Sequence, residues 1–364
     1  MARRLLMGTL VVVTLYVSWP SSTPVVVGDP PHSAYVNHSP PRTERMVANV
    51  PSHPHVSSDF PFHVFNNHVF VVVGIPTTDT TFGRQRRDWQ RGSWFTYPEV
   101  VGRGDIANPQ RAMLVRYLIG RHPDHGFKFS DELIDEQQAN EDIIALNMKE
   151  GKPVTGKKSG GAGYWGLESE VGMSRKALMW YRIAFDLFSS DYAMKCDDDV
   201  FIRVPQYLAD LRQLPRERLY WGKVMKWGAI KGDPRSKFYF VGGMSITLSR
   251  DLLWEINRYN ALQKLVGTFD PSFNYKEHNM DHEDVMIGRV FFNLKTNVTV
   301  VKDCRFHDVH VGANVKPIQA TSVAIHHLGE GEYGMLMKRF ENSVIKTTFR
   351  ASTARPYHTA LSPC

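Results

Sequence analysis

The chain has 364 residues, of which 42% are hydrophobic and 12% aromatic, and this is enough apolar material for a sizeable core and excludes a disordered protein. The formal net charge is +7, but the basic residues are scattered and form no cluster typical of a nucleic-acid-binding arm, so we expect no nucleic-acid partner. Three cysteines allow at most one disulfide, which excludes a disulfide-based scaffold.

The first residues have the pattern of a membrane anchor. Arg3 and Arg4 precede an apolar stretch over residues 5–27, and this order predicts that residues 1–4 lie in the cytosol. A spanning helix needs roughly 17–25 residues, so residues 5–27 can serve as a transmembrane signal-anchor. A cleaved signal peptide is the alternative, and both interpretations place the rest of the chain in the lumen of the secretory pathway.

Residues 28–66 are rich in Pro, His and Ser and lack periodic hydrophobic positions, which is typical of a flexible stem. We therefore expect one folded domain over residues 67–350, followed by a C-terminal tail over residues 351–364. Asn297-Val298-Thr299 is a sequon for N-glycosylation, and Asn37-His38-Ser39 is a poorer one because Pro40 follows it.

Short apolar strands alternate with helices from residue 67 onward. We expect strands over residues 69–75, 113–119, 142–146, 192–195, 201–203 and 243–248, and helices over residues 131–139, 174–188, 206–211, 251–259 and 284–292. Ser174 is the expected N-cap of the long helix. This alternation predicts an α/β sandwich with a largely parallel central sheet.

Three consecutive carboxylates, Asp197, Asp198 and Asp199, follow one expected strand and precede another. In a protein interior such a cluster repels itself unless it is solvated or holds a cation. Open α/β sheets bind ligands at the carboxyl ends of their strands, so we expect Mg²⁺ or Mn²⁺ here, with a diphosphate completing its coordination. An exposed acidic turn is the alternative.

Asp284 lies in the first turn of an expected helix, within the segment Asp281-His282-Glu283-Asp284. Acidic residues at a helix N-terminus are favoured by the helix dipole, and this alone can explain them. Beside a separate metal cluster, however, Asp284 becomes a candidate general base.

Two other patterns allow more than one interpretation. Gly242 and Gly243 allow a close approach of backbone to a ligand, or a tight turn. The histidines of residues 307–310 and 326–327 are candidate metal ligands, although a single histidine is more often structural. The chain contains no P-loop, nucleophile-elbow or His-Glu-x-x-His motif, which excludes several common enzyme classes.

Taken in order, the motifs between residues 69 and 340 resemble those of the β-1,3-glycosyltransferases, glycosyltransferase family thirty-one, and look closest to its trypanosomatid branch. The segments that carry the resemblance are residues 87–94, 113–120 and 141–144, Lys176 with Trp180, the metal motif at residues 195–201, the glycine-rich strand at residues 239–249, Glu283-Asp284-Val285 with Gly288, and Ile325-His326-His327. Cysteines that the family has before the metal motif and beside the glycine-rich strand are absent.

The resemblance implies a GT-A-like fold and an inverting hexosyltransferase in the Golgi membrane, with a single span and a lumenal domain. It implies UDP-galactose or UDP-N-acetylglucosamine as donor, Mn²⁺ or Mg²⁺ as cofactor and a glycan acceptor joined in β-1,3 linkage. It further implies Asp284 as the base and Asp199 and His326 as metal ligands, and it assigns donor binding to Arg87, Arg91, Lys176, Asp197, Asp198, Gly242 and Gly243.

Two other functions are compatible with the same residues. A lumenal sugar-binding protein on a decayed transferase fold fits the missing cysteines, since fold does not fix function. A metal-dependent hydrolase or phosphotransferase is the other, but the sequence offers no second histidine-carboxylate cluster. Transfer of sugar, as opposed to its release or simple binding, separates the three functions.

Overall fold

The computed structural model describes residues 52–62, 65–102, 112–156, 163–228, 237–310, 317–352 and 358–364. The predicted anchor at residues 5–27 and much of the predicted stem lie outside these ranges. Among the described residues, no helix combines the length and the hydrophobicity needed to cross a bilayer.

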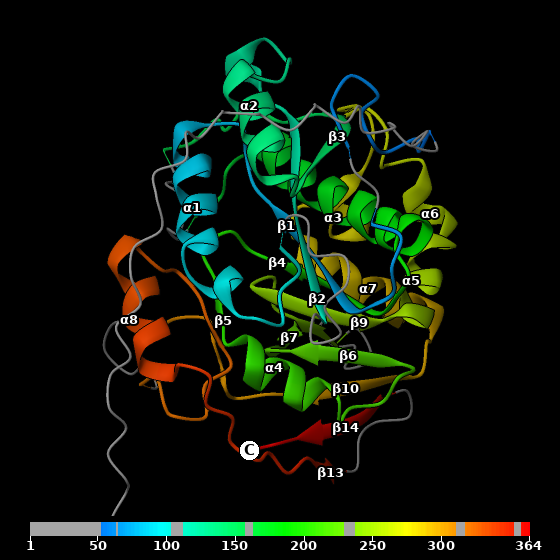
Figure 1. Ribbon diagram of the computed structural model, residues 1–364. Helices are drawn as coiled ribbons and strands as arrows, with labels where there is room; N and C mark the ends of the chain where they lie inside the picture. The colour runs from blue at the N-terminus through cyan, green and yellow to red at the C-terminus, as the bar shows by residue number, and fades with distance from the viewer. Residues whose placement is uncertain are drawn as a thin grey trace, which may run out of the picture. The chain divides into compact units, whose positions relative to one another are not determined.

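A nine-stranded sheet, in the order β13-β14-β10-β6-β9-β4-β1-β2-β3, forms the centre of the described chain (Figure 1). Only β9 and β13 run antiparallel to their neighbours, which confirms the predicted, largely parallel sheet. The strands are β1 (Val69–Pro76), β2 (Met113–Arg121), β3 (Ile143–Lys149), β4 (Ser190–Cys196), β6 (Leu219–Gly222), β9 (Ser245–Ser249), β10 (Val298–Lys302), β13 (Arg350–Ser352) and β14 (His358–Ser362).

Two small sheets flank the central one. One contains β11 (Phe306–His307), β12 (Ala324–Ile325) and β5 (Phe201–Ile202), and the other pairs β7 (Val224–Trp227) with β8 (Phe238–Val241). The three-stranded sheet matters for the site, because β5 follows the aspartate triplet and β12 precedes His326. It therefore brings two segments more than a hundred residues apart to the same place.

Helices cover both faces of the central sheet. Side chains alternate along each strand, so successive residues of one strand pack into different cores. Val71 and Val73 of β1 belong to the core beneath α4 and α8, whereas Val72 belongs to the core beneath α3, α5 and α7 (Figure 1). The helices are α1 (Thr81–Arg91), α2 (Asp131–Asn140), α3 (Leu167–Leu187), α4 (Val204–Leu211), α5 (Arg250–Asn257), α6 (Asn260–Gln263), α7 (Glu283–Leu294) and α8 (Glu330–Phe340), with 3-10 turns at Trp94–Thr96, Pro123–His125 and Tyr275–His278.

The long helix α3 begins earlier than the sequence pattern predicts. It starts at Leu167, directly after Gly166, whose φ of 105° ends the preceding loop. Ser174 is therefore not an N-cap but a buried residue inside the helix, where its hydroxyl donates a hydrogen bond to the backbone oxygen of Met280. The prediction failed because a serine can satisfy its hydroxyl through a tertiary contact as well as through a cap.

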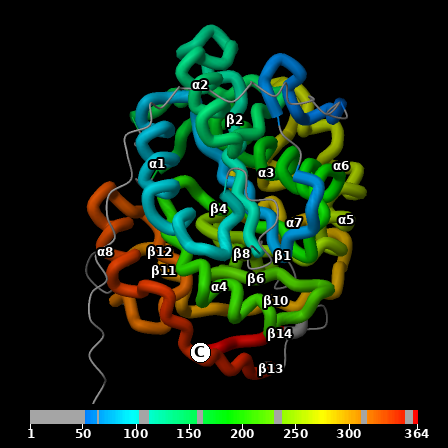
Figure 2. Tube along the Cα trace, in the orientation of Figure 1, coloured from blue at the N-terminus to red at the C-terminus, as the bar shows by residue number. Residues whose placement is uncertain are grey.

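The packed chain extends beyond residues 67–350 at both ends. Residues 52–62 lie against the sheet: Val56 forms a bridge with Leu146, and Phe60 is buried in the core. At the other end, β14 pairs with β10 and with β13, the edge strand opposite β3 in the sheet order, and Figure 2 shows β14 between β10 and β13. A disulfide joins Cys304 to Cys364, so part of the predicted C-terminal tail belongs to the fold.

Candidate active site

A cavity of 340 Å³ lies where four parallel strands end. Its lining includes Thr77 after β1, His122 after β2, Glu150 after β3 and Asp197 after β4. Helices α1 and α3 supply much of the remaining wall. The cavity thus occupies the carboxyl edge of the sheet, where open α/β folds bind their ligands.

The three aspartates are part of this cavity, and each has its own partners. Asp197 pairs with Lys195 at 2.5 Å, and Asp198 accepts a hydrogen bond from Thr77 at 2.8 Å. Arg86 bridges the other two, because its guanidinium contacts both Asp198 and Asp199. The triplet is therefore not an exposed acidic turn, since basic groups surround it on the wall of a cavity.

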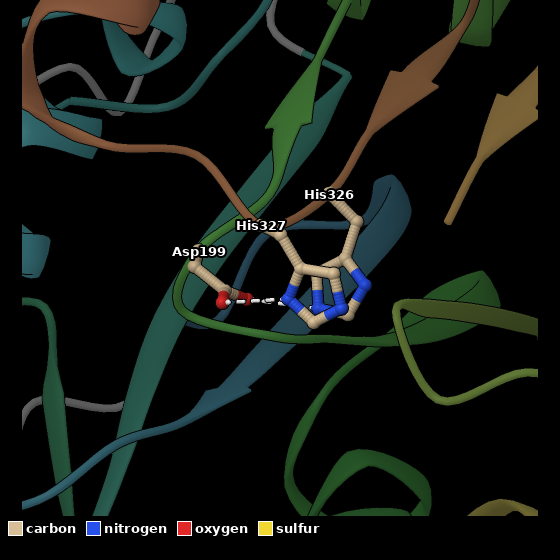
Figure 3. Close-up of side chains that lie close together, drawn as sticks. All are labelled: Asp199, His326 and His327. Carbon is tan, nitrogen blue, oxygen red and sulfur yellow. Dashed lines mark ion pairs between the residues drawn. The ribbon is translucent and has the colours of Figure 1, made fainter. Parts of the chain in front are cut away.

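Asp199, His326 and His327 could together hold a metal ion. Their ligand atoms all lie within 4.8 Å of one another, and Figure 3 shows the two imidazole rings stacked beside the carboxylate. The ring centroids are 3.7 Å apart, and Asp199 Oδ1 lies 2.9 Å from His326 Nε2. One carboxylate and two imidazoles form a donor set that suits a divalent transition metal such as Mn²⁺.

The charge of His326 depends on its carboxylate neighbours. Burial on its own lowers the pKa of this imidazole, but hydrogen bonds with Asp197, Asp199 and Asp308 raise it to about 11. The protonated ring therefore neutralises the carboxylates, whereas a metal needs the neutral nitrogen. Metal binding here must release a proton.

The arginine of α1 that lines the cavity is Arg86, whereas the resemblance implies Arg87 and Arg91. Arg87 pairs with Glu136 at 2.6 Å, and Arg91 pairs with Glu136 and Asp142. Neither lines the cavity, whereas Arg86 does. Residues four apart share one helix face, and this face packs on α2 and on Asp142 before β3, so the donor-binding role implied for Arg87 and Arg91 stays a prediction.

Lys176 lines the cavity, in agreement with the position that the resemblance implies. Its ammonium group is nevertheless held by the cavity wall, since Nζ donates to the backbone oxygen of Thr77 at 2.6 Å and lies 2.7 Å from Glu150 Oε1. The side chain is buried, so these two contacts fix its position at the carboxyl ends of β1 and β3. Lys176 therefore contributes a fixed positive charge to the wall.

The carboxylate of Asp284, in the first turn of α7, contacts the segment Gly242-Gly243 between β8 and β9. None of these three residues lines the cavity. The Asp284 carboxylate accepts hydrogen bonds from the backbone N–H groups of Gly243 and Val285. A Cβ on Gly243 would lie 2.4 Å from Glu283 Oε1, so this glycine allows close contact with a neighbouring side chain of the protein itself. Burial raises the pKa of Asp284, although backbone hydrogen bonds and the positive charge of Lys195 act in the opposite direction.

A buried lysine connects this region to the aspartate triplet. Lys195 Nζ lies 2.5 Å from both Asp197 and Glu283, and it also donates to the backbone oxygen of Gly243. Sequence reasoning named Lys195 only as part of a motif. It did not name Arg86 or Thr77 as site residues, although Arg86 directly adjoins Arg87, and it named His327 only as one of several candidate metal ligands.

The chain matches no model of a known protein family, but it is similar to several plant proteins. In Arabidopsis thaliana, the protein named "Probable beta-1,3-galactosyltransferase 12" is 28% identical over 207 residues, which is 56% of this chain and 49% of that protein. "Probable beta-1,3-galactosyltransferase 13" of the same plant is 26% identical over 265 residues, or 71% of this chain and 67% of that protein. These similarities support a β-1,3-glycosyltransferase family.

A third plant relative has a narrower name. "Hydroxyproline O-galactosyltransferase HPGT3" is 20% identical over 202 residues, which is 51% of this chain and 52% of that protein. The chain thus spans about half to two thirds of the length of these curated relatives. The mixed α/β structure, with its largely parallel sheet, fits a GT-A-like fold.

Proposed function

We propose that the chain is an inverting, metal-dependent hexosyltransferase that moves galactose or N-acetylglucosamine from a UDP-sugar to a hydroxyl group of a glycan. The observation that carries the proposal is the clustering of Asp199, His326 and His327 on a cavity at the carboxyl edge of the sheet. The similarity to proteins named galactosyltransferases supports the same reaction class. A β-1,3 linkage and a relationship to the trypanosomatid branch are finer parts of this proposal.

The residues of the cavity and Asp284, which lies outside it, have different roles in the proposed reaction. Asp199, His326 and His327 would hold Mn²⁺ or Mg²⁺, which supplies charge stabilisation at the diphosphate of the departing UDP. Arg86 and Lys176 add fixed positive charge to the same wall. Asp197 and Asp198 accept hydrogen bonds on the donor side, and Asp284 takes the proton of the acceptor hydroxyl as it attacks.

The proposal predicts transfer that depends on a divalent metal. The purified chain with Mn²⁺ should release UDP from UDP-galactose or UDP-N-acetylglucosamine and transfer the sugar to a glycan acceptor. Chelator should abolish the reaction, and added Mn²⁺ should restore it. The measurement is UDP release together with detection of the disaccharide product, for each donor in turn.

Other outcomes of this assay would point to the alternative functions. Full transfer in chelator would contradict the metal-dependent mechanism. Free sugar without any disaccharide product would indicate a hydrolase. Nucleotide or sugar binding without any turnover would indicate a sugar-binding protein on a decayed transferase fold.

We also propose that the folded domain lies in the lumen of the Golgi, and Asn297 offers a test of this location. Asn297 is exposed between α7 and β10, and Asn297-Val298-Thr299 is a sequon. When the full chain is expressed in eukaryotic cells, an N-glycosidase should lower its mass. Asn297→Gln should remove that change and Thr299→Ser, which keeps the sequon, should retain it; a chain without any glycan would count against the lumenal location.

A further inference from the structure

Asp308 lies between the candidate histidines His307 and His310 and has no role in the reaction proposed above. His307 and His310 are not members of the metal cluster, because their side chains contact Ser322 and Glu332 instead. Asp308, between them in the sequence, contacts His326. We propose that Asp308 is a positioning residue that fixes the orientation and the tautomer of His326 for metal binding; this inference rests on the metal-dependent function proposed above.

The two ring nitrogens of His326 face different carboxylates. Nδ1 lies 3.3 Å from Asp308 Oδ1, whereas Nε2 lies 2.9 Å from Asp199 Oδ1 and 3.3 Å from Asp197 Oδ2. A neutral imidazole carries one N–H group and one lone pair. When Asp308 accepts the Nδ1–H group, the lone pair of Nε2 faces Asp199, and this is the tautomer that a metal ligand requires.

The backbone of the three-stranded sheet holds Asp308 beside His326. Strands β11 and β12 pair in parallel, with His307 opposite Ile325, and the backbone N–H of His326 donates to the backbone oxygen of His307 at 3.0 Å. Asp308 and His326 are therefore the next residues along the two paired strands. Their proximity follows from the strand register and does not depend on a mobile side chain.

A second contact orients the Asp308 carboxylate. Lys223, between β6 and β7, places its ammonium nitrogen 3.0 Å from Asp308 Oδ2, so one carboxylate oxygen faces the lysine and the other faces His326. The Asp308 side chain is about one-third exposed, at 34%. Ion pairs that are this exposed contribute little to stability. The loss of Asp308 should therefore affect the metal site more than the fold.

The test compares Mn²⁺ affinity in three variants of the full chain, read from the electron paramagnetic resonance signal of free Mn²⁺. Asp308→Asn should weaken Mn²⁺ binding by about 10–100-fold, the usual cost of losing the partner of a ligating histidine, while its thermal unfolding stays close to that of the unmodified chain. Lys223→Met leaves the carboxylate in place but removes its second partner, so it should weaken binding by a smaller factor.

Glu332→Gln is the matched control, because Glu332 pairs with His310 of the same segment at 2.7 Å and His310 is not a member of the cluster. This variant should bind Mn²⁺ as the unmodified chain does. Unchanged affinity in folded Asp308→Asn, or an equal loss in Glu332→Gln, would overturn the positioning role. If Asp308→Asn does not fold, unchanged affinity in Lys223→Met would overturn it. Failure of the unmodified chain to bind Mn²⁺ would instead refute the proposed metal-dependent function.

Discussion

Asp199→Asn should abolish hexose transfer and weaken Mn²⁺ binding. The loss of affinity should exceed the factor of about 10–100 that is typical when a ligating histidine loses its hydrogen-bond partner. Asp199 supplies the only carboxylate of the metal cluster found among the described residues. Asparagine keeps the shape of the side chain but removes its negative charge, and hard divalent cations depend on that charge. Calorimetry of UDP binding with and without Mn²⁺, together with the rate of UDP release, measures both losses.

Asp198→Asn is the control for this experiment, because it makes the same change one residue away. Asp198 contacts Arg86 and Thr77 and is not part of the metal cluster, so the variant should keep most of its Mn²⁺ affinity. If Asp199→Asn and Asp198→Asn lose Mn²⁺ affinity equally, the triplet acts through its total charge and not through one ligand. If Asp199→Asn binds Mn²⁺ normally, the proposed metal site is wrong.

The parallel core of the fold was predictable from the sequence, because its strands have recognisable local hydrophobic patterns. Strand β1 is a continuous apolar run and β2 is apolar up to Ile119 except for Arg116, and near-continuous runs are typical of strands buried on both faces. The C-terminal strands could not be found in this way. β14 contains His358, Thr359 and Ser362, and its pairing with β10 and β13 makes it a strand.

The site was predictable where the chemistry is concentrated in a short motif. Three consecutive aspartates after a strand indicated the carboxyl edge of the sheet, and the structure places Asp197, Asp198 and Asp199 on the cavity there. Arg86 was missed because α1 contains four arginines, and the sequence does not say which of them faces the cavity. That choice depends on how α1 rotates as Arg87 and Arg91 pair with α2.

Long-range pairing also explains why the sequence gives Asp308 no role and leaves His327 as one of several candidate metal ligands. Asp308 lies eighteen residues before His326, and only the register of β11 with β12 brings the two together. Nothing in the local sequence around residue 308 indicates that register. A histidine pair also gives no information about which ring faces a carboxylate, and here both rings do.

Asp284→Asn should lower the transfer rate by about 10²–10⁴-fold and leave Mn²⁺ and UDP affinity near normal, because a positioned general base contributes this much to turnover. The backbone N–H groups of Gly243 and Val285 donate to different oxygens of Asp284, so asparagine keeps one of these hydrogen bonds and loses the other, and thermal unfolding of the variant measures that loss separately from the rate. Burial raises the pKa of Asp284, and a base must be ionised to act, so transfer by the unmodified chain should fall as the pH drops through that raised pKa.

The competing explanation of Asp284 is that it only complements the dipole of α7. In that case Asp284→Asn would cost about 0.3–1 kcal/mol of stability and leave turnover almost intact. Glu330→Gln is the matched control, since Glu330 is an exposed acid in the first turn of α8 and lies outside the cavity. Steady-state transfer kinetics and thermal unfolding of both variants separate the two explanations, because a base affects the rate by orders of magnitude and a dipole contact does not. An Asp284→Asn variant with the transfer rate of the Glu330→Gln variant would remove Asp284 from the mechanism.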